Sequence, residues 1–208
     1  FIFCLALPAG IFAQRFMPED SGSGKDVVLK LLAQDQPSTL QEALFLIDES
    51  TEQNTPEYAA LCSAILFHDH GLDSGNLESA ESYLGEATGQ QKSSPVGLLA
   101  RTLIARAPDA EPDEDLDEQL AEIDTESPTV SSYALLAAAE RAHQKGETNA
   151  ALALFKKSAL REDAPARALH RLAIVLAQNK NFDAAIQFIQ VLWEKCPAHG
   201  GSLATAAA

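Results

Sequence analysis

Acidic residues crowd one stretch of the chain, and part of their spacing is that of a calcium site. Residues 109–126 hold ten Asp or Glu and no Lys or Arg. Asp113, Asp115 and Asp117 have the 1-3-5 spacing of a calcium-binding loop, and Asp124 falls at the twelfth position. The sixth position needs glycine and holds Glu118 instead. We therefore expect no metal here and interpret the acids as the exposed face of a helix.

Two histidines near the middle of the chain also have metal-ligand chemistry. His68 and His70 are two residues apart, so on a helix their side chains point about 200° apart and do not converge on one ion. Because Gly71 follows, we interpret the pair as the end of a helix.

A short segment near the N-terminus resembles a phosphate-binding loop. Residues 21–26 read SGSGKD, but the loop's first glycine is replaced by Glu19, and Asp26 stands where Ser or Thr should hold magnesium. We expect a flexible linker over 14–24. No Gly-x-Ser-x-Gly, His-Glu-x-x-His or paired Cys-x-x-Cys motif occurs. The sequence therefore predicts a protein that is not an enzyme, with no cofactor and no metal.

Composition indicates the kind of elements that must carry any binding surface. The 208 residues include 36 Ala and 28 Leu, both strong helix formers, while aromatic residues make up only 6%. We therefore predict an all-α fold.

A pattern repeats along the chain at intervals close to 35 residues. Short segments with an apolar-x-x-Ala core place equivalent residues at 43, 80, 116, 151 and 185, and a proline follows each at 56, 95, 128, 165 and 197. Proline suits the first turn of a helix and not its interior, so each one separates two helices. The expected first helices are 25–35, 56–70, 95–107, 130–145 and 165–179, and the second helices are 38–51, 77–90, 114–126, 147–162 and 181–196.

Several residues mark the expected helix ends. Gly71 and Gly146 sit where a left-handed residue would end a helix. Ser38, Thr55 and Ser94 are the expected N-caps. A single hairpin cannot bury its apolar face, whereas stacked neighbours can. Cys62 and Cys196 would then lie about three repeats apart, so we expect no disulfide between them.

The last two repeats resemble the tetratricopeptide repeat (TPR) family. The resemblance is clearest over residues 130–200 and degenerate over 25–129. Ala138, Lys180 and Asp163 depart from the pattern, where the family favours Leu, Gly and Pro. The resemblance implies a right-handed solenoid of about five antiparallel helical hairpins over 25–200. The matching residues are Gly146, Ala151, Phe155, Leu169, Leu172, Ala173, Phe182, Ala185 and Pro197.

Members of that family mostly bind peptides or proteins on the concave face of their first helices. The Lys and Asn set that binds a C-terminal carboxylate in chaperone-binding members is absent, which disfavours that class of partner. The other concave-face positions of the first helices either bind a partner or are ordinary solvated residues. The positions carried over are Tyr133, Glu140, His143 and Gln144 in the fourth repeat and Arg167, His170 and Gln178 in the fifth.

The chain is strongly acidic in one part only. Residues 1–129 carry a net charge of −18 and residues 130–208 a net charge of +3. Nonspecific nucleic-acid binding needs a basic surface, so this partner class is not expected.

The two ends of the sequence suggest where the protein works. Residues 1–13 are apolar, too short to span a bilayer, and similar to the later part of a signal peptide. Residues 201–208 are expected to be a disordered tail or a truncated helix. We therefore expect a noncatalytic interaction scaffold of the bacterial cell envelope or periplasm, or a cytoplasmic protein if residues 1–13 are not a signal. The alternative is a repeat segment of a larger protein whose effector or enzymatic domain is missing.

Overall fold

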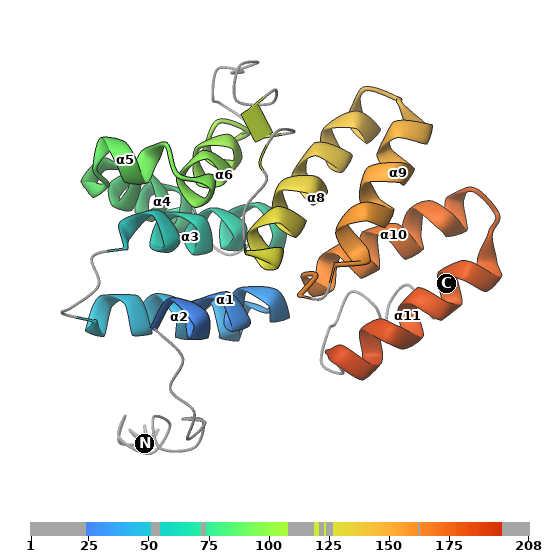
Figure 1. Cartoon of the computed structure of the whole chain (residues 1–208), viewed down its shortest axis with the longest axis horizontal. Helices are drawn as coiled ribbons and strands as arrows, with labels where there is room; N and C mark the ends of the chain where they lie inside the picture. The colour runs from blue at the N-terminus through green and yellow to red at the C-terminus, as the bar shows by residue number, and fades with distance from the viewer. Residues whose placement is uncertain are drawn as a thin grey trace, which may run out of the picture.

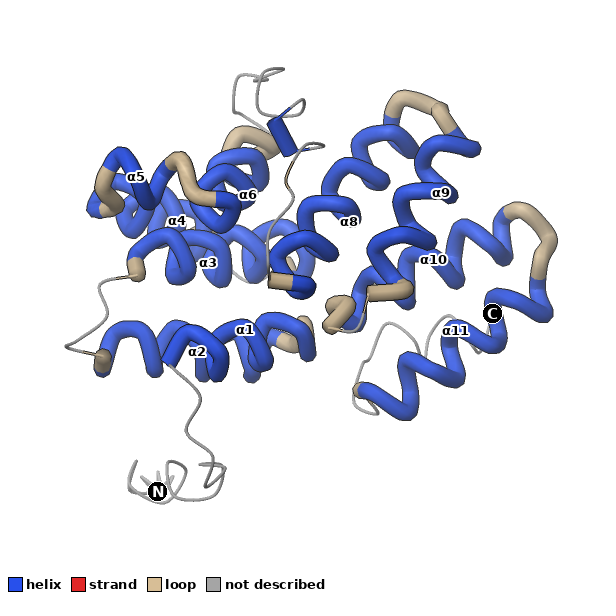
Figure 2. The backbone as a smooth tube through the Cα atoms, viewed as in Figure 1, coloured by secondary structure: helices blue, strands red, loops and turns tan. Residues whose placement is uncertain are grey.

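The computed structural model describes residues 24–50, 55–71, 74–107, 119–120, 123, 127–161 and 163–196. Helices are the only regular secondary structure in these ranges (Figures 1 and 2), so the predicted all-α class is confirmed. The helices are α1 (Gly24–Gln34), α2 (Pro37–Glu49), α3 (Pro56–His70), α4 (Gly75–Glu86), α5 (Gly89–Lys92), α6 (Pro95–Ile104), α8 (Pro128–Gln144), α9 (Thr148–Ala159), α10 (Ala166–Gln178) and α11 (Phe182–Lys195).

Consecutive helices pack as pairs, and α6 lies between the α3–α4 pair and α8. The pairs are α1 with α2, α3 with α4, α8 with α9 and α10 with α11, while α2 packs on α3 and α9 on α10. Figure 1 shows α1–α6 on one side of the molecule and α9–α11 on the other, with α8 between them. Buried apolar residues from both sides form one continuous core.

The predicted helix boundaries agree with most of these elements to within a few residues. Pro56, Pro95 and Pro128 each occupy the first turn of a helix, as expected from their fixed φ. The prediction that Ser38 caps α2 is wrong, because the N-cap is Gln36 and Pro37 begins the helix. Most of the predicted helix 114–126 lies outside the described residues, although Leu120 is buried as its spacing requires.

The predicted helix 77–90 is wrong at its end. α4 stops at Glu86, and a separate short helix, α5, follows. Thr88 starts it through a capping box: its hydroxyl accepts from the Gln91 backbone N–H at 3.3 Å, and Gln91 Oε1 accepts from the Thr88 N–H at 2.8 Å. α5 packs tightly on α6 at Gly97. A Cβ added to this glycine would overlap the Gln91 carbonyl oxygen, so the close approach needs a residue without a side chain.

The turns of the last two hairpins have the same backbone geometry, 34 residues apart. Gly146 and Lys180 both have left-handed backbone, with φ of 77° and 61°. The Gly146 N–H donates to the His143 carbonyl at 3.0 Å, and the Lys180 N–H donates to Ala177 at 2.9 Å. Each next residue also donates back to the preceding helix: Glu147 N–H to Ala142 O and Asn181 N–H to Leu176 O, both at 2.9 Å.

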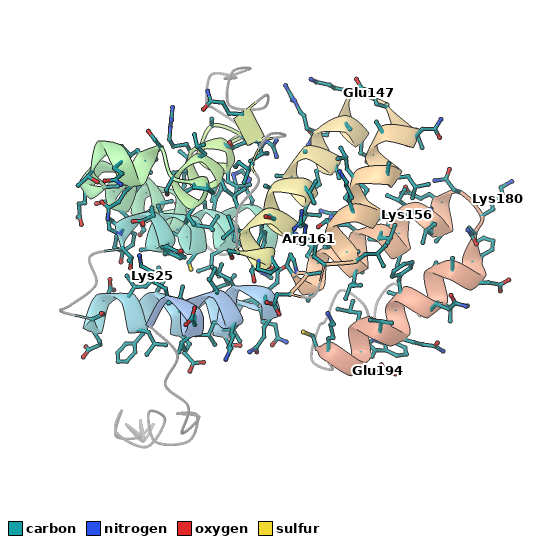
Figure 3. The ribbon with its side chains drawn as sticks, in the orientation of Figure 1. Lys25, Glu147, Lys156, Arg161, Lys180 and Glu194 are labelled. Carbon is teal, nitrogen blue, oxygen red and sulfur yellow. The ribbon has the colours of Figure 1, made fainter. Side chains whose placement is uncertain are left out.

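Figure 3 places Lys180 at the tip of the α10–α11 turn and Glu147 at the tip of the α8–α9 turn. The observed helix ends at Gly71, with φ of 58°, and at Gly146 confirm the predicted left-handed positions. Lys180 therefore occupies a glycine conformation without being glycine.

Replacing Lys180 by glycine is expected to stabilise the fold. A residue with a Cβ costs about 1 kcal/mol in the left-handed region, so Lys180→Gly should raise the unfolding free energy by about that amount in urea titrations. Gly146→Ala should lower it by a similar amount. Gly85→Ala is the control: it lies inside α4 with open space around its Cβ position, and should stabilise by about 0.5–1 kcal/mol. A loss of stability in Lys180→Gly would contradict the assigned turn.

Candidate functional site

The structure divides the seven predicted partner residues into a buried, a half-buried and an exposed group. We call the surface of α8 and α10 that carries them the partner face. Tyr133 and Arg167 are buried, with 2% and 8% of their surface exposed. Glu140 and His170 are half-buried, whereas His143, Gln144 and Gln178 are exposed at the C-terminal ends of α8 and α10.

The burial of Tyr133 and Arg167 differs from the expectation that each of the seven residues binds a partner or is solvated. Both side chains point to the last turn of α1, which covers this part of the partner face. Tyr133 donates a hydrogen bond from its hydroxyl to the Leu32 carbonyl oxygen at 2.9 Å. Arg167 contacts Asp35, the residue that follows α1.

Asp35 lies at the centre of this contact and is completely buried. Its backbone is left-handed, with φ of 50°, and its N–H donates to Leu32 O at 3.0 Å. Aspartate tolerates this conformation better than most residues. Gln36 and Thr39 then cap α2, since the Gln36 N–H donates to Thr39 Oγ1 at 3.3 Å and Thr39 Oγ1 donates to the Gln36 carbonyl at 3.0 Å. This two-residue connection turns the carboxylate inward.

The Asp35 carboxylate binds two elements that are distant in sequence. Its Oδ2 accepts from the backbone N–H of Arg167 at 3.2 Å and lies 3.9 Å from that residue's Nε. Its Oδ1 lies 3.5 Å from His70 Nε2, at the end of α3. The carboxylate therefore joins the α1–α2 connection, α3 and the start of α10.

The last turn of α1 meets the C-terminal helix as well. The Cys196 thiol, just after α11, donates to the Gln34 carbonyl oxygen at 3.7 Å. We call this whole contact the α1 junction. Its members are Leu32, Gln34, Asp35, His70, Tyr133, Arg167 and Cys196. Cys62 and Cys196 are both free and buried.

Burial and neighbouring charges act in opposite directions in the α1 junction. Burial raises the pKa of Asp35, but the Arg167 guanidinium and the contacts of His70 outweigh it, so the pKa lies below 3.8. Burial lowers the pKa of Arg167 to about 10, with Asp35 opposing the shift. Burial and the negative charge of Asp35 raise the pKa of Tyr133 well above 10.0. At neutral pH the junction thus holds a paired carboxylate and guanidinium beside a protonated phenol.

A second polar contact crosses from α8 to α10. Arg171 Nε lies 3.3 Å from Glu140 Oε1. Arg106, after α6, donates from Nη1 to the Ala137 carbonyl of α8 at 3.2 Å. Burial raises the pKa of Glu140, although Arg171 and Arg106 oppose it. Glu140 thus links α8 to α10 as well as lying on the partner face.

The two histidines of α3 have different partners. His68 Nε2 bonds to the Leu103 carbonyl of α6, and burial lowers the pKa of His68 despite that hydrogen bond. His70 faces Asp35 instead. Within the described ranges, no group of three or more His, Cys, Asp or Glu side chains is placed to hold a metal ion.

The arrangement binds helices to one another and offers polar groups at the exposed ends of α8 and α10. Comparison of the chain with family models, curated proteins and solved structures finds no match. Among the helices described, none has the length and apolar character needed to cross a bilayer.

The negative charge of Asp35 is expected to contribute far more to the unfolding free energy than the charge of an exposed carboxylate. Asp35→Asn keeps the side-chain shape and suits left-handed backbone, but removes the negative charge that faces the buried Arg167 guanidinium. We expect it to lower the unfolding free energy by about 3–5 kcal/mol at pH 7 in urea titrations.

The pH dependence gives this prediction a second readout. Because the folded-state pKa of Asp35 lies below 3.8, the stabilisation is fully present above about pH 5 and is lost as pH falls through the folded-state value. The gap between wild type and Asp35→Asn should therefore close in acid. Asp48→Asn is the control, since Asp48 is exposed and its two carboxylate oxygens lie 3.2 and 3.3 Å from the Tyr83 hydroxyl that donates to them. Equal effects of the two substitutions would rule out the assigned role.

Proposed function

We propose that this chain is a noncatalytic, TPR-like α-solenoid that binds a peptide or protein partner on the partner face. In this proposal the helix pairs stack as right-handed hairpin repeats. The first helices of the last two hairpins, α8 and α10, supply the binding residues.

The repeated turn is the observation that carries this proposal. The hydrogen bonds at Gly146 and Glu147 recur at Lys180 and Asn181, after the same 34-residue interval. The second helices then begin alike, because Ala151 N–H donates to Glu147 O at 2.9 Å and Ala185 N–H to Asn181 O at 3.1 Å. Two turns with matching backbone geometry, 34 residues apart, support a stacked repeat.

Exposure supports a binding role for one end of the partner face. His143 and Gln144 end α8, and Gln178 ends α10, so equivalent ends of neighbouring first helices both carry exposed polar side chains. The His143 ring also lies edge-on to Phe155, with centroids 6.5 Å apart.

The proposed site of action is the periplasm or cell envelope of a bacterium. Support comes from the signal-like composition of residues 1–13, which lie outside the described residues. The net charge of −15 disfavours nucleic acid as the partner.

Affinity capture from envelope extract tests the proposal. The tagged chain should retain a specific protein that is lost in a variant carrying His143→Ala, Gln144→Ala and Gln178→Ala. All three side chains are exposed, so the far-UV circular dichroism of the variant should match wild type. The control variant carries Lys156→Ala and Lys157→Ala on α9, where both lysines are exposed, and should retain the protein. Equal capture by all three proteins would contradict a binding role for this face.

A further inference from the structure

Part of the partner face is already occupied by the chain itself. Tyr133 and Arg167 are buried because the last turn of α1 lies against them. The bonds come from Leu32 and Asp35, which precede Tyr133 and Arg167 by 101 and 132 residues. A partner that touched these two side chains would have to take the place of that turn.

We propose that the last turn of α1 is an internal ligand of the partner face, and that the structure is a closed state which a carboxylate-bearing peptide opens by competing with Asp35. This inference rests on the proposed function, because it names the chemistry of the partner and a control on its access. The partner segment would resemble the turn it replaces: the C-terminal end of a helix followed by an acidic residue.

The groups that hold Asp35 bind its carboxylate. They are the Arg167 backbone N–H at 3.2 Å, its guanidinium and the His70 imidazole at 3.5 Å. Another carboxylate in the same position would receive the same interactions. Tyr133 donates its hydrogen bond to a backbone carbonyl, that of Leu32, and an acidic helix end would offer the same kind of acceptor.

The energetics of such a contact permit exchange. Removing two charges from water costs free energy that offsets most of the attraction within a buried ion pair. The free energy of the Asp35–Arg167 contact is therefore close to that of a contact between Arg167 and the carboxylate of a partner. Within the described residues, α1 packs chiefly on α2 and α8. The α1–α2 hairpin contacts the C-terminal hairpins at the α1 junction. Its other helix, α2, packs on α3.

Native-state hydrogen exchange of the wild-type chain tests whether the hairpin opens on its own. Backbone amides of α1 should exchange through an opening at least tenfold more populated than the opening that exposes the core of α8 and α10. Exchange of α1, α8 and α10 through one common opening would overturn the proposal, because the turn could not then leave the partner face of a folded chain.

Competition by a peptide tests the chemistry of the ligand. The probe is a fluorescent peptide of residues 24–36, titrated against the full chain and followed by anisotropy. It should bind an Asp35→Gly chain at least tenfold more tightly than wild type, because glycine keeps the left-handed turn but leaves the carboxylate position free. A matched peptide carrying Asp35→Asn should lose that binding. Equal affinity of the two peptides, or of the two chains, would overturn the proposal.

The two proposals fail separately. Peptide binding without envelope capture would leave the internal ligand intact and remove the scaffold role. Capture with a single common opening in hydrogen exchange would leave the scaffold role intact and remove the closed state. If Asp35→Gly does not fold, hydrogen exchange of the wild-type chain decides alone.

Discussion

A charge buried without water must be neutralised by a neighbour, and in this protein that requirement ties together distant parts of the chain. Asp35 is fully buried at the end of the first helix, and the cation that balances it, Arg167, lies at the start of α10. Neither residue is stable in the interior alone. The first and last hairpins must therefore meet, and the helices between them have to be arranged so that this is possible.

Apolar burial and polar pairing have different roles in this arrangement. The continuous core, with side chains such as Leu32, Leu136 and Leu172 fully excluded from water, supplies most of the folding free energy. Apolar contacts of this kind tolerate small changes of register between helices. The α1 junction does not, because the Tyr133 hydroxyl and the Asp35 carboxylate each need a partner at hydrogen-bonding distance. It fixes how the helix pairs are placed relative to one another.

The sequence predicted what depends on local rules. Prolines such as Pro56 and Pro95 mark helix starts because their φ is fixed, and Gly146 marks a turn because left-handed backbone favours it. The resemblance to the TPR family placed Lys180 where that family favours glycine, and the structure gives Lys180 left-handed backbone, with φ of 61°. The short helix α5 was missed because its signal, a capping box at Thr88, lies within an expected helix end.

The α1 junction was beyond local rules. Aspartate is common in exposed loops, and nothing near Asp35 in the sequence reveals that this one is buried. Tyr133 and Arg167 were selected for the partner face by their place in the repeat, which gives a side chain's direction but not what covers it. The covering residues come from 101 and 132 positions earlier.

A double-mutant cycle between Asp35→Asn and Arg167→Met measures the coupling on which this account depends. Both groups are buried, so the coupling energy in urea titrations at pH 7 should exceed about 1.5 kcal/mol. The cycle of Glu140→Gln with Arg171→Met is the comparison. Its ion pair is partly exposed, with 47% of the Arg171 side chain in solvent, and should give about 0–1 kcal/mol. Additive effects of Asp35→Asn and Arg167→Met, within about 0.5 kcal/mol, would contradict the claim that this pair joins the two ends of the fold.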